Sequence, residues 1–354
     1  MGFDFNAIVE KAYESGASDI HLTIGLPPVL RVSGRLTRLE EENIEPEDTD
    51  KFVNDMLKPE QLAVLEENGE YDCAISVMDK YRFRMNCFRK QGEYAVALRK
   101  IDSDIMTLTQ LGLPENLRHF TDKTQGIVLV TGPTGSGKST TLAALIDIIN
   151  SERDCHILCL EDPIEFIHDH KMSIVNQREI GSDSKTYPNA LRAALREDPD
   201  VILIGEMRDH ESIAIALTAA ETGHLVFSTL HTISAAKAID RIIDVFPPSQ
   251  QQQIRFQLSI TLVGVVAQQL VPRAAGKGRR AAAEVMFCTP AIRNLIREGK
   301  TPQINNAIMS GTSYGMVSMD NSLIKLYKSG EISRDELMYR CIDDVYVKQN
   351  IAEL

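Results

Sequence analysis

One run of nine residues, 132–140, has the residue types and spacing of a phosphate-binding loop. It reads Gly132, Pro133, Thr134, Gly135, Ser136, Gly137, Lys138, Ser139 and Thr140, which fits the pattern G-x-x-x-x-G-K-[ST]. Glycines let the backbone turn tightly and aim its N–H groups inward, and a helix N-terminus adds partial positive charge. Lys138 would reach the β- and γ-phosphates of a nucleotide, and the Ser139 hydroxyl would bind Mg²⁺. The run therefore predicts a nucleotide site that uses magnesium.

The residues on either side supply the context that this motif needs. Residues 127–131 are apolar and rich in β-branched side chains, which predicts a buried parallel strand. Residues 139–150 form a mostly apolar run, which predicts a buried helix. Strand, glycine-rich turn and helix in this order favour a phosphate loop over an ordinary glycine-rich turn.

A carboxylate that could hold the metal follows a second apolar run, residues 201–205. Glu206 ends this predicted strand, and carboxylates at the carboxyl ends of parallel strands face the ligand crevice. Gly205 stands where many enzymes of this kind have aspartate, so Glu206 would make the metal contact. That contact would run through water, because Mg²⁺ keeps several of its waters. The run is therefore predicted to be a Walker B strand.

A base that could activate water is expected after the predicted strand 156–160. Glu161, Asp162 and Glu165 follow that strand. Three carboxylates beside a phosphate repel one another unless a metal or a proton offsets them, so one is a candidate base. The residues alone leave Glu161 and Glu165 both open.

Histidines and arginines are candidates for sensing or neutralising the phosphate. His224 and His231 bracket the predicted strand 225–230, where an imidazole could sense a γ-phosphate, although a lone histidine is more often structural. A cation supplied from another subunit can raise a hydrolysis rate about 10³–10⁵-fold. Four arginines lie on predicted strands of the N-terminal region: Arg82, Arg84, Arg89 and Arg99.

Two regions of different pattern must position these residues. The first hundred residues mix short helices with alternating strands, which predicts an α+β domain. From residue 114 strands alternate with helices, which predicts an α/β fold with a parallel sheet covered on both faces. The expected strands there are 127–131, 156–160, 173–177, 201–205 and 225–230, and the expected helices 139–150, 186–196, 210–222 and 234–245. After Pro247-Pro248 the pattern predicts mostly helix, with a basic connecting loop at 272–280.

Composition narrows the class of protein. The chain has 354 residues, 43% hydrophobic and 25% charged, with a net charge of −12, which is typical of a globular protein of two domains. This charge disfavours attraction to nucleic acid or to an anionic membrane. No apolar run approaches 18 residues, and the N-terminus lacks the pattern of a signal peptide. The six cysteines form no C-x-x-C pair, so we expect reduced thiols and no zinc site.

These motifs, in this order, resemble the PilT family, the retraction motors of bacterial type IV pili within the secretion ATPase superfamily. The run 291–298, AIRNLIRE, is the most specific, because it resembles the C-terminal signature of the retraction motors. By itself the run predicts only an amphipathic helix with Arg293 and Arg297 on one face. The stretches that carry the resemblance are 132–141, 160–166, 173–179, 190–209, 219–232 and 291–298.

The resemblance implies roles for the candidate residues. Glu165 is similar to the family's catalytic base, which decides between it and Glu161. Glu206 matches the Walker B glutamate, and His224 and His231 match the His box. The activity implied is hydrolysis of ATP to ADP and phosphate, with Mg²⁺, coupled to mechanical work.

The resemblance also implies an architecture and partners. It implies a PAS-like N-terminal domain over 1–100, a flexible linker over 101–113 and a RecA-like ATPase domain with a helical C-terminal part over 114–354. Arg84 and Arg99 best match the N-domain arginines that reach the nucleotide of the same or a neighbouring subunit. The family assembles as a homo-hexamer in the cytoplasm, peripheral to the inner membrane through the platform protein at the pilus base.

Three other functions stay open at this point. Extension motors of the superfamily carry a tetracysteine zinc motif and a longer N-terminal region, which this sequence lacks, so retraction and twitching motility are favoured. A nucleic-acid motor is disfavoured by the acidic balance and the lack of a basic groove with aromatic residues. A nucleotide-gated scaffold without turnover is disfavoured by the complete set of base, metal and phosphate candidates.

Overall fold

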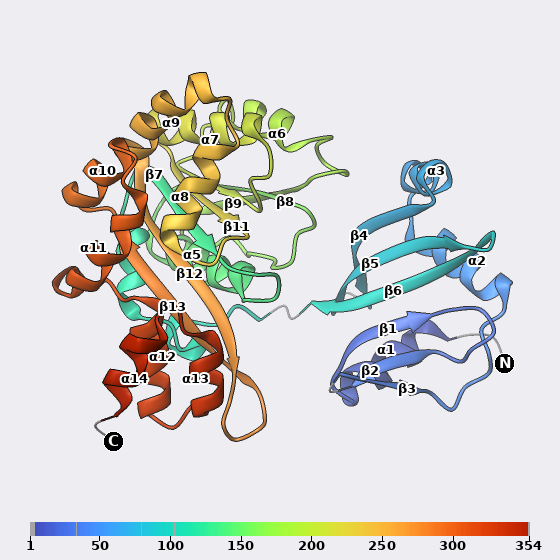
Figure 1. Ribbon diagram of the computed structural model, residues 1–354. Coiled ribbons are helices and arrows are strands. Elements are labelled where there is room, and N and C mark those ends of the chain that lie inside the picture. The colour runs from blue at the N-terminus through green and yellow to red at the C-terminus, as the bar shows by residue number, and fades with distance from the viewer. Residues whose placement is uncertain (1–3, 33, 79, 102–103, 353–354) are drawn as a thin grey trace. The chain divides into compact units, whose positions relative to one another are not determined.

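The computed structural model describes residues 4–32, 34–78, 80–101 and 104–352, so residues 102 and 103 of the predicted linker lie outside the described residues. By its internal contacts the chain divides into two compact units, drawn together in Figure 1. The first comprises Met1–Asp104 with Asp162–Ile167, and the second comprises Ile105–Glu161 with His168–Leu354.

The first unit is one antiparallel sheet covered on one face by helices. The strand order is β3-β2-β1-β6-β5-β4, and the core is formed between this sheet and the three helices. The strands are β1 (Ala17–Leu22), β2 (Val29–Val32), β3 (Arg35–Arg38), β4 (Glu70–Val77), β5 (Tyr81–Lys90) and β6 (Glu93–Ile101). The helices are α1 (Phe5–Glu14), α2 (Pro46–Met56) and α3 (Pro59–Asn68).

Alternation along the strands decides which side chains leave the core of this unit. On β5 Phe83, Met85 and Cys87 are buried, whereas Arg84 between them is exposed. Since neighbouring residues of a strand point to opposite faces, Arg84 of β5 and its cross-strand partner Arg99 of β6 fall on the face that the helices leave open, whereas Arg89 points to the other face and pairs with Glu66 of α3.

The second unit is a seven-stranded sheet in the order β13-β12-β7-β11-β10-β8-β9. Strands from β12 to β9 run parallel, and β13 is antiparallel to β12. The strands are β7 (Gly126–Thr131), β8 (His156–Glu161), β9 (Ile174–Glu179), β10 (Val201–Ile204), β11 (Leu225–Leu230), β12 (Leu262–Pro272) and β13 (Arg279–Phe287). This sheet with its helices confirms the predicted α/β class.

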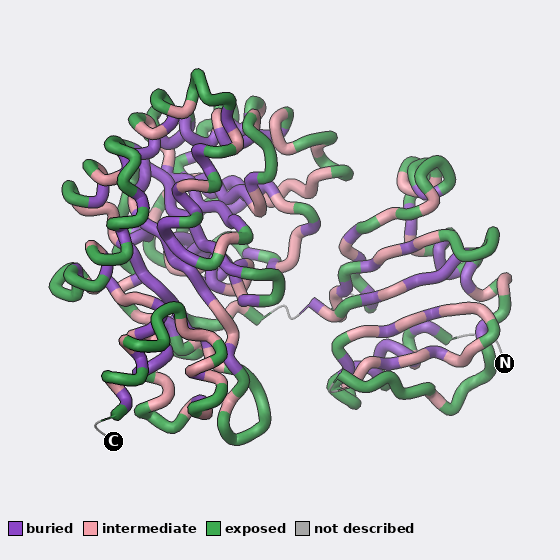
Figure 2. The backbone as a smooth tube through the Cα atoms, in the orientation of Figure 1, coloured by how far each residue is buried: buried purple, intermediate pink, exposed green. Residues whose placement is uncertain are grey.

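Helices cover both faces of this sheet, which explains its continuous apolar runs. Every residue of β7, β10 and β11 is buried, and Figure 2 shows these central strands in purple. The α-helices are α4 (Leu108–Leu111), α5 (Lys138–Glu152), α6 (Tyr187–Ala194), α7 (His210–Glu221), α8 (Ala235–Asp244), α9 (Pro248–Thr261), α10 (Pro290–Arg297), α11 (Ile304–Ser310), α12 (Met319–Lys328), α13 (Arg334–Arg340) and α14 (Asp344–Ile351). Three 3₁₀ helices are η1 (Glu115–Phe120), η2 (Thr301–Gln303) and η3 (Thr312–Tyr314). In the described ranges no helix is both long and apolar enough to cross a bilayer.

Local capping explains where several helices begin. The side chains of Asp209 and Ser234 accept hydrogen bonds from the first-turn N–H groups of α7 and α8. Thr289 does the same for α10, whose first residue, Pro290, favours the start of a helix. These signals are local, so the predicted helix positions agree closely with the structure.

The region after residue 248 is mostly helical, as predicted, but β12 and β13 form a long hairpin there that the sequence pattern did not predict. Three consecutive alanines, which have low β-propensity, occupy the middle of β13, whereas β12 is rich in valine and leucine, an apolar run that does not by itself separate a strand from a buried helix. The strands form because β12 pairs with β7 and completes the core on both faces of the sheet. The basic loop 272–280 joins the two strands, and its Arg273 and Arg280 pair with Glu331 at 3.3 and 2.9 Å.

Candidate active site

The predicted phosphate loop connects β7 to α5, which confirms the strand, turn and helix expected around it. All three of its glycines have a positive φ that a side chain would strain, and at two of them a Cβ would also meet β12. Gly132 has φ +149°, and a Cβ there would lie 2.3 Å from the backbone oxygen of Gln268. Gly137, with φ +89°, is the N-cap of α5, and its Cβ would lie 2.9 Å from the Gln268 Nε2 atom. The loop therefore lies directly against β12 on one side.

The polar groups inside the loop fit an anion. The Lys138 ammonium donates to the carbonyl oxygens of Gly132 at 3.0 Å and Pro133 at 3.2 Å, so it is held over the loop. The Ser136 hydroxyl is buried and has no hydrogen-bond partner among the described residues. A buried hydroxyl without a partner costs free energy, and a phosphate oxygen would satisfy it. The cradle therefore fits a nucleotide phosphate.

Ser139, a predicted magnesium ligand, lies at the start of α5, next to Lys138. Ser139 and Thr140 are half-buried in the first turn of α5, and Thr134 and Gly135 are exposed at the tip of the loop. Within the described residues no three His, Cys, Asp or Glu side chains gather as a metal site. Mg²⁺ bound with a nucleotide needs only one or two protein oxygens, because phosphates and waters fill its other positions. The residues present fit that mode of binding.

Glu206, two residues after β10, lies between two basic side chains. Its carboxylate is 2.8 Å from Arg208 and 3.0 Å from the Nε2 atom of His231. Partial burial of Glu206 opposes its ionisation, but the Arg208 hydrogen bond and the charges of Arg208, His231 and Lys138 outweigh that burial. The pKa of Glu206 therefore lies below its usual range, and the side chain is a carboxylate at neutral pH.

The topology of the sheet is what gathers these groups. β7, β11 and β10 are neighbouring parallel strands, so their carboxyl ends meet at one edge of the sheet. The phosphate loop follows β7, His231 follows β11 and Glu206 follows β10. At the same edge Thr229 donates to the Gly205 carbonyl at 2.6 Å, which ties the ends of β10 and β11 together. Ligands bind at this edge in open α/β sheets.

His224 is not part of this group. It precedes β11 and so lies at the opposite edge of the sheet from His231. Its Nδ1 atom is 2.9 Å from the carbonyl oxygen of Ala219 near the end of α7, and its own carbonyl accepts from the Gly126 N–H. Six residues of strand separate the two histidines, so their Cα atoms are seven steps or about 23 Å apart at about 3.3 Å per residue. The structure therefore places His224 in the turn between α7 and β11.

The two candidate bases lie in different units. Glu161 is the last residue of β8, and its carboxylate accepts a hydrogen bond from the Gln177 side chain at 3.1 Å. Glu165 belongs to Asp162–Ile167, the segment grouped with the first unit. In that segment the Ile164 carbonyl accepts from the Arg82 guanidinium at 3.0 Å. The role of Glu165 as the catalytic base stays a prediction.

Arg84 and Arg99 are direct cross-strand neighbours on β5 and β6. Like charges in this arrangement repel each other, and carboxylates on both sides offset the repulsion. Arg84 is 3.6 Å from Asp72, and Arg99 donates to Asp19 at 2.9 Å. The Arg99 side chain is still 72% exposed, so both guanidinium groups remain accessible to a further anion.

The sequence did not reveal one residue that contacts the phosphate loop. Gln268 of β12 is 3% exposed, and its side chain binds both Ser136 and Thr141. Its only signal was a polar residue inside an apolar run, and that run was predicted to be helical. A glutamine 132 positions from Ser136 becomes its neighbour only through strand pairing.

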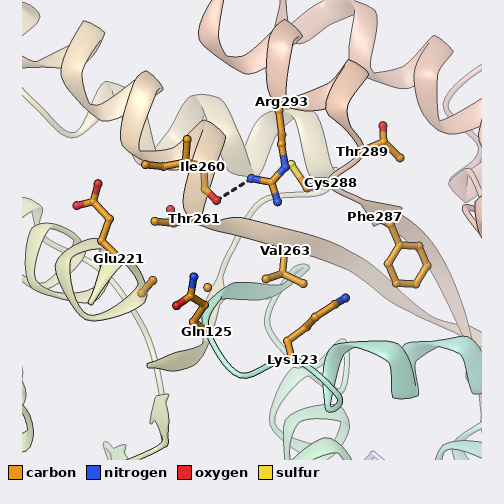
Figure 3. A pocket seen from close by; sticks show the side chains of 12 residues that line it. Lys123, Gln125, Glu221, Ile260, Thr261, Val263, Phe287, Cys288, Thr289 and Arg293 are labelled. Carbon is orange, nitrogen blue, oxygen red and sulfur yellow. Dashed lines mark hydrogen bonds between the residues drawn. The ribbon is translucent and has the colours of Figure 1, made fainter. Parts of the chain in front are cut away.

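The signature run 291–298 contains α10, whose arginines contact α9. Arg293 donates to the carbonyl oxygens of Ser259 at 3.0 Å and Ile260 at 2.6 Å, the last of these drawn in Figure 3. The Arg297 guanidinium lies 5.8 Å from the centre of the Phe256 ring. Arg293 also lines a cavity of about 410 Å³, which reaches Gly126 at the amino end of β7, opposite the phosphate loop. Both arginines therefore stabilise the C-terminal end of α9.

Comparison with known proteins agrees with this fold. The sequence profile of the family described as "Type II/IV secretion system protein" matches residues 3–333. The chain belongs to the Type II/IV secretion system protein family. The resemblance to the PilT family that the motifs indicate is confirmed by relatives and a solved structure of that name.

Members of this family with named functions match over nearly the whole chain. The chain is 48% identical over 332 residues to the "Type IV pilus retractation ATPase PilT" of Pseudomonas aeruginosa, covering 94% of this chain and 96% of that protein. It is 46% identical over 306 residues to the "Twitching motility protein" of Neisseria gonorrhoeae, covering 86% and 82%. The crystal structure of the pilus retraction motor PilT with bound ADP matches with a TM-score of 0.91 and 46% identity, covering 98% and 99%. The predicted ATPase class agrees with these relatives.

Proposed function

We propose that the protein is a hexameric ATP-hydrolysing motor that retracts type IV pili and so drives twitching motility. The observation that carries the proposal is the phosphate loop with Glu206 and His231 at the carboxyl ends of three neighbouring strands. The similarity to PilT over nearly the full length of both chains supports the direction of the motor.

Each residue of the site has a proposed task. Lys138, the Ser136 hydroxyl and the N–H groups of the loop bind the phosphates, and Ser139 with Glu206 holds Mg²⁺. Bound ATP supplies the γ-phosphoryl group that is transferred to water. Glu165 accepts the proton of the attacking water.

The basic residues have separate tasks. His231 orients the Glu206 carboxylate, from which it lies 3.0 Å away. His224 has a structural role, because its contact with the Ala219 carbonyl holds the turn that leads into β11. Arg84 and Arg99 supply positive charge to the nucleotide of the same or a neighbouring subunit, a task that their exposure allows.

We propose the same domains and partners that the family resemblance implies. These are a PAS-like domain over 1–100, a linker over 101–113 and a RecA-like domain over 114–354. The motor would work in the cytoplasm, held at the inner membrane by the platform protein of the pilus base. Six-fold assembly predicts a particle of six times the 39.4 kDa chain mass in solution, which mass photometry measures.

ATPase assays on the full chain test the catalytic part of the proposal. Glu206→Gln and Glu165→Gln should each abolish turnover and leave ADP binding largely intact, because each keeps the shape of the side chain and loses the charge. Glu152→Gln is the matched control, since Glu152 forms only an exposed ion pair with Arg118 at the far end of α5. Full activity of Glu206→Gln would refute its role.

Complementation tests the biological part. The gene should restore twitching to a Pseudomonas aeruginosa strain that lacks its own PilT, and the Glu206→Gln variant should not.

Turnover that depends on DNA and falls steeply with salt would instead support a nucleic-acid motor. Nucleotide binding without any turnover by the unmodified protein would support a scaffold.

A further inference from the structure

Gln268 occupies a place in the sheet where a polar side chain is unexpected. β12 runs parallel to β7, and Ala267 pairs with Thr131, so Gln268 is level with the first residue of the phosphate loop, Gly132. Its neighbours Val265, Val266 and Ala267 are buried and apolar, and Gln268 itself is 3% exposed. A buried amide is unfavourable unless both its donor and its acceptor find partners.

Both ends of this amide bind the loop and the helix that follows it. The Nε2 atom donates to the Ser136 carbonyl at 2.8 Å, and the Oε1 atom accepts from the Thr141 hydroxyl at 2.7 Å. A carbonyl oxygen can only accept, so the NH₂ group must face Ser136 and the orientation of the amide is determined by its partners. Gln268 therefore joins the loop to the first turn of α5.

The bond to Ser136 has a consequence for the next N–H group. The Ser136 carbonyl and the Gly137 N–H belong to one planar trans peptide, so they point in opposite directions. Because the carbonyl faces Gln268, the N–H of Gly137 points away from β12. Backbone N–H groups at the start of a helix are the donors that bind phosphate in such loops.

We propose that Gln268 is a positioning residue that sets the phosphate loop for nucleotide binding, by holding the Ser136–Gly137 peptide with its N–H turned away from β12. The crowding on that side agrees with this role, since a Cβ on Gly132 would meet the backbone oxygen of Gln268 and one on Gly137 would meet its amide. A flipped peptide would place a carbonyl oxygen where the N–H belongs and would repel a phosphate. The inference rests on the proposed nucleotide binding.

Substitutions at position 268 separate the two hydrogen bonds. Gln268→Glu keeps an acceptor for Thr141 but turns a carboxylate oxygen toward the Ser136 carbonyl, so it favours the flipped peptide. Gln268→Met keeps the length of the side chain without either bond. Thr141→Val removes only the bond that orients the amide. We expect the KM for ATP and the Kd for ADP to rise about tenfold in Gln268→Met and more in Gln268→Glu, with a smaller rise in Thr141→Val.

The kinetic signature separates positioning from simple stabilisation. The N–H contact serves the bound substrate and the transition state alike, so KM should rise while kcat changes little. The stabilisation that ADP adds to the melting temperature should shrink in parallel. Gln269→Glu is the matched control, because it adds the same charge one residue along β12 on the opposite face.

Each outcome decides between explanations. Unmodified protein that does not bind ADP would overturn the proposed function itself, whatever the variants do. Unmodified protein that binds ADP, with Gln268→Met and Thr141→Val binding equally well, would overturn the positioning role. A lower melting temperature without nucleotide, at unchanged KM, would show that Gln268 is only part of the core. If Gln268→Glu does not fold, Gln268→Met and Thr141→Val carry the test alone.

Discussion

Replacing Arg293 by alanine removes two hydrogen bonds that hold the end of α9. Arg293 donates to the Ser259 and Ile260 carbonyls, which have no later turn of helix to bind them. Hydrogen bonds that involve a charged group contribute about 1.5–3 kcal/mol each at most sites. Arg293 borders a cavity of about 410 Å³, so water can reach the freed carbonyls and reduce the cost. We expect the free energy of unfolding to fall by about 2 kcal/mol in total.

Thermal and urea unfolding of the full chain measure this loss. In a chain of 354 residues about 2 kcal/mol corresponds to a fall in melting temperature of roughly 3 °C, because the entropy of unfolding is about 2.1 cal/mol/K per residue. Arg297→Ala is the control on the same helix, because its exposed contact with Phe256 contributes only about 0.5–1 kcal/mol. ATP turnover measured well below the melting temperature should persist in both variants, since α10 is remote from the phosphate loop.

The result that refutes this reasoning is specific. If Arg293→Ala unfolds like the unmodified protein but no longer restores twitching, Arg293 acts on a partner and the α9 contact is incidental. If Arg297→Ala costs as much stability as Arg293→Ala, the hydrogen bonds to the α9 carbonyls are not the cause.

Two further predictions concern the sheet edge that carries the site. The pKa of Glu206 lies below its ordinary value of 4.5, so its stabilising contribution is complete above that pH and is lost as the pH falls through the lower folded value. The melting temperature of Glu206→Gln should accordingly fall less steeply below about pH 4.5 than that of the unmodified protein, and parallel curves would contradict the ion pair. Gly132→Ala should abolish the stabilisation by ADP, because its Cβ meets the backbone of β12, whereas Gly135→Ala, with open space around it, should keep much of it. Equal loss in both would mean that positive φ, and not the contact with β12, is decisive.

Much of the fold could be predicted because its signals are local. The strand, loop and helix around Lys138 depend on residues within about twenty positions of one another, and each is specified by its own apolar pattern. The same is true of the helices that begin at Asp209 and Ser234, whose caps lie three residues from their partners. The N-terminal strands were predictable for a similar reason, since one open face leaves a clean alternation.

The hairpin of β12 and β13 could not be predicted in this way. The three alanines of β13 carry little strand preference, and the apolar run of β12 fits a buried helix as well as a strand. The strands form because β7 offers a parallel edge and both faces are covered. A local sequence pattern contains no information about a strand partner that lies more than a hundred residues away.

The amino-acid sequence by itself determined which chemical groups the site contains, since the loop residues and Glu206 follow their strands directly along the chain. Only the tertiary structure decided which of them meet. Strand order brings His231 to Glu206 and leaves His224 at the other edge, although both histidines flank the same strand. The pairing of β12 with β7 brings Gln268 against the phosphate loop. The physical reason is that neighbours in a sheet are set by burial and pairing of whole strands, which no short stretch of sequence contains.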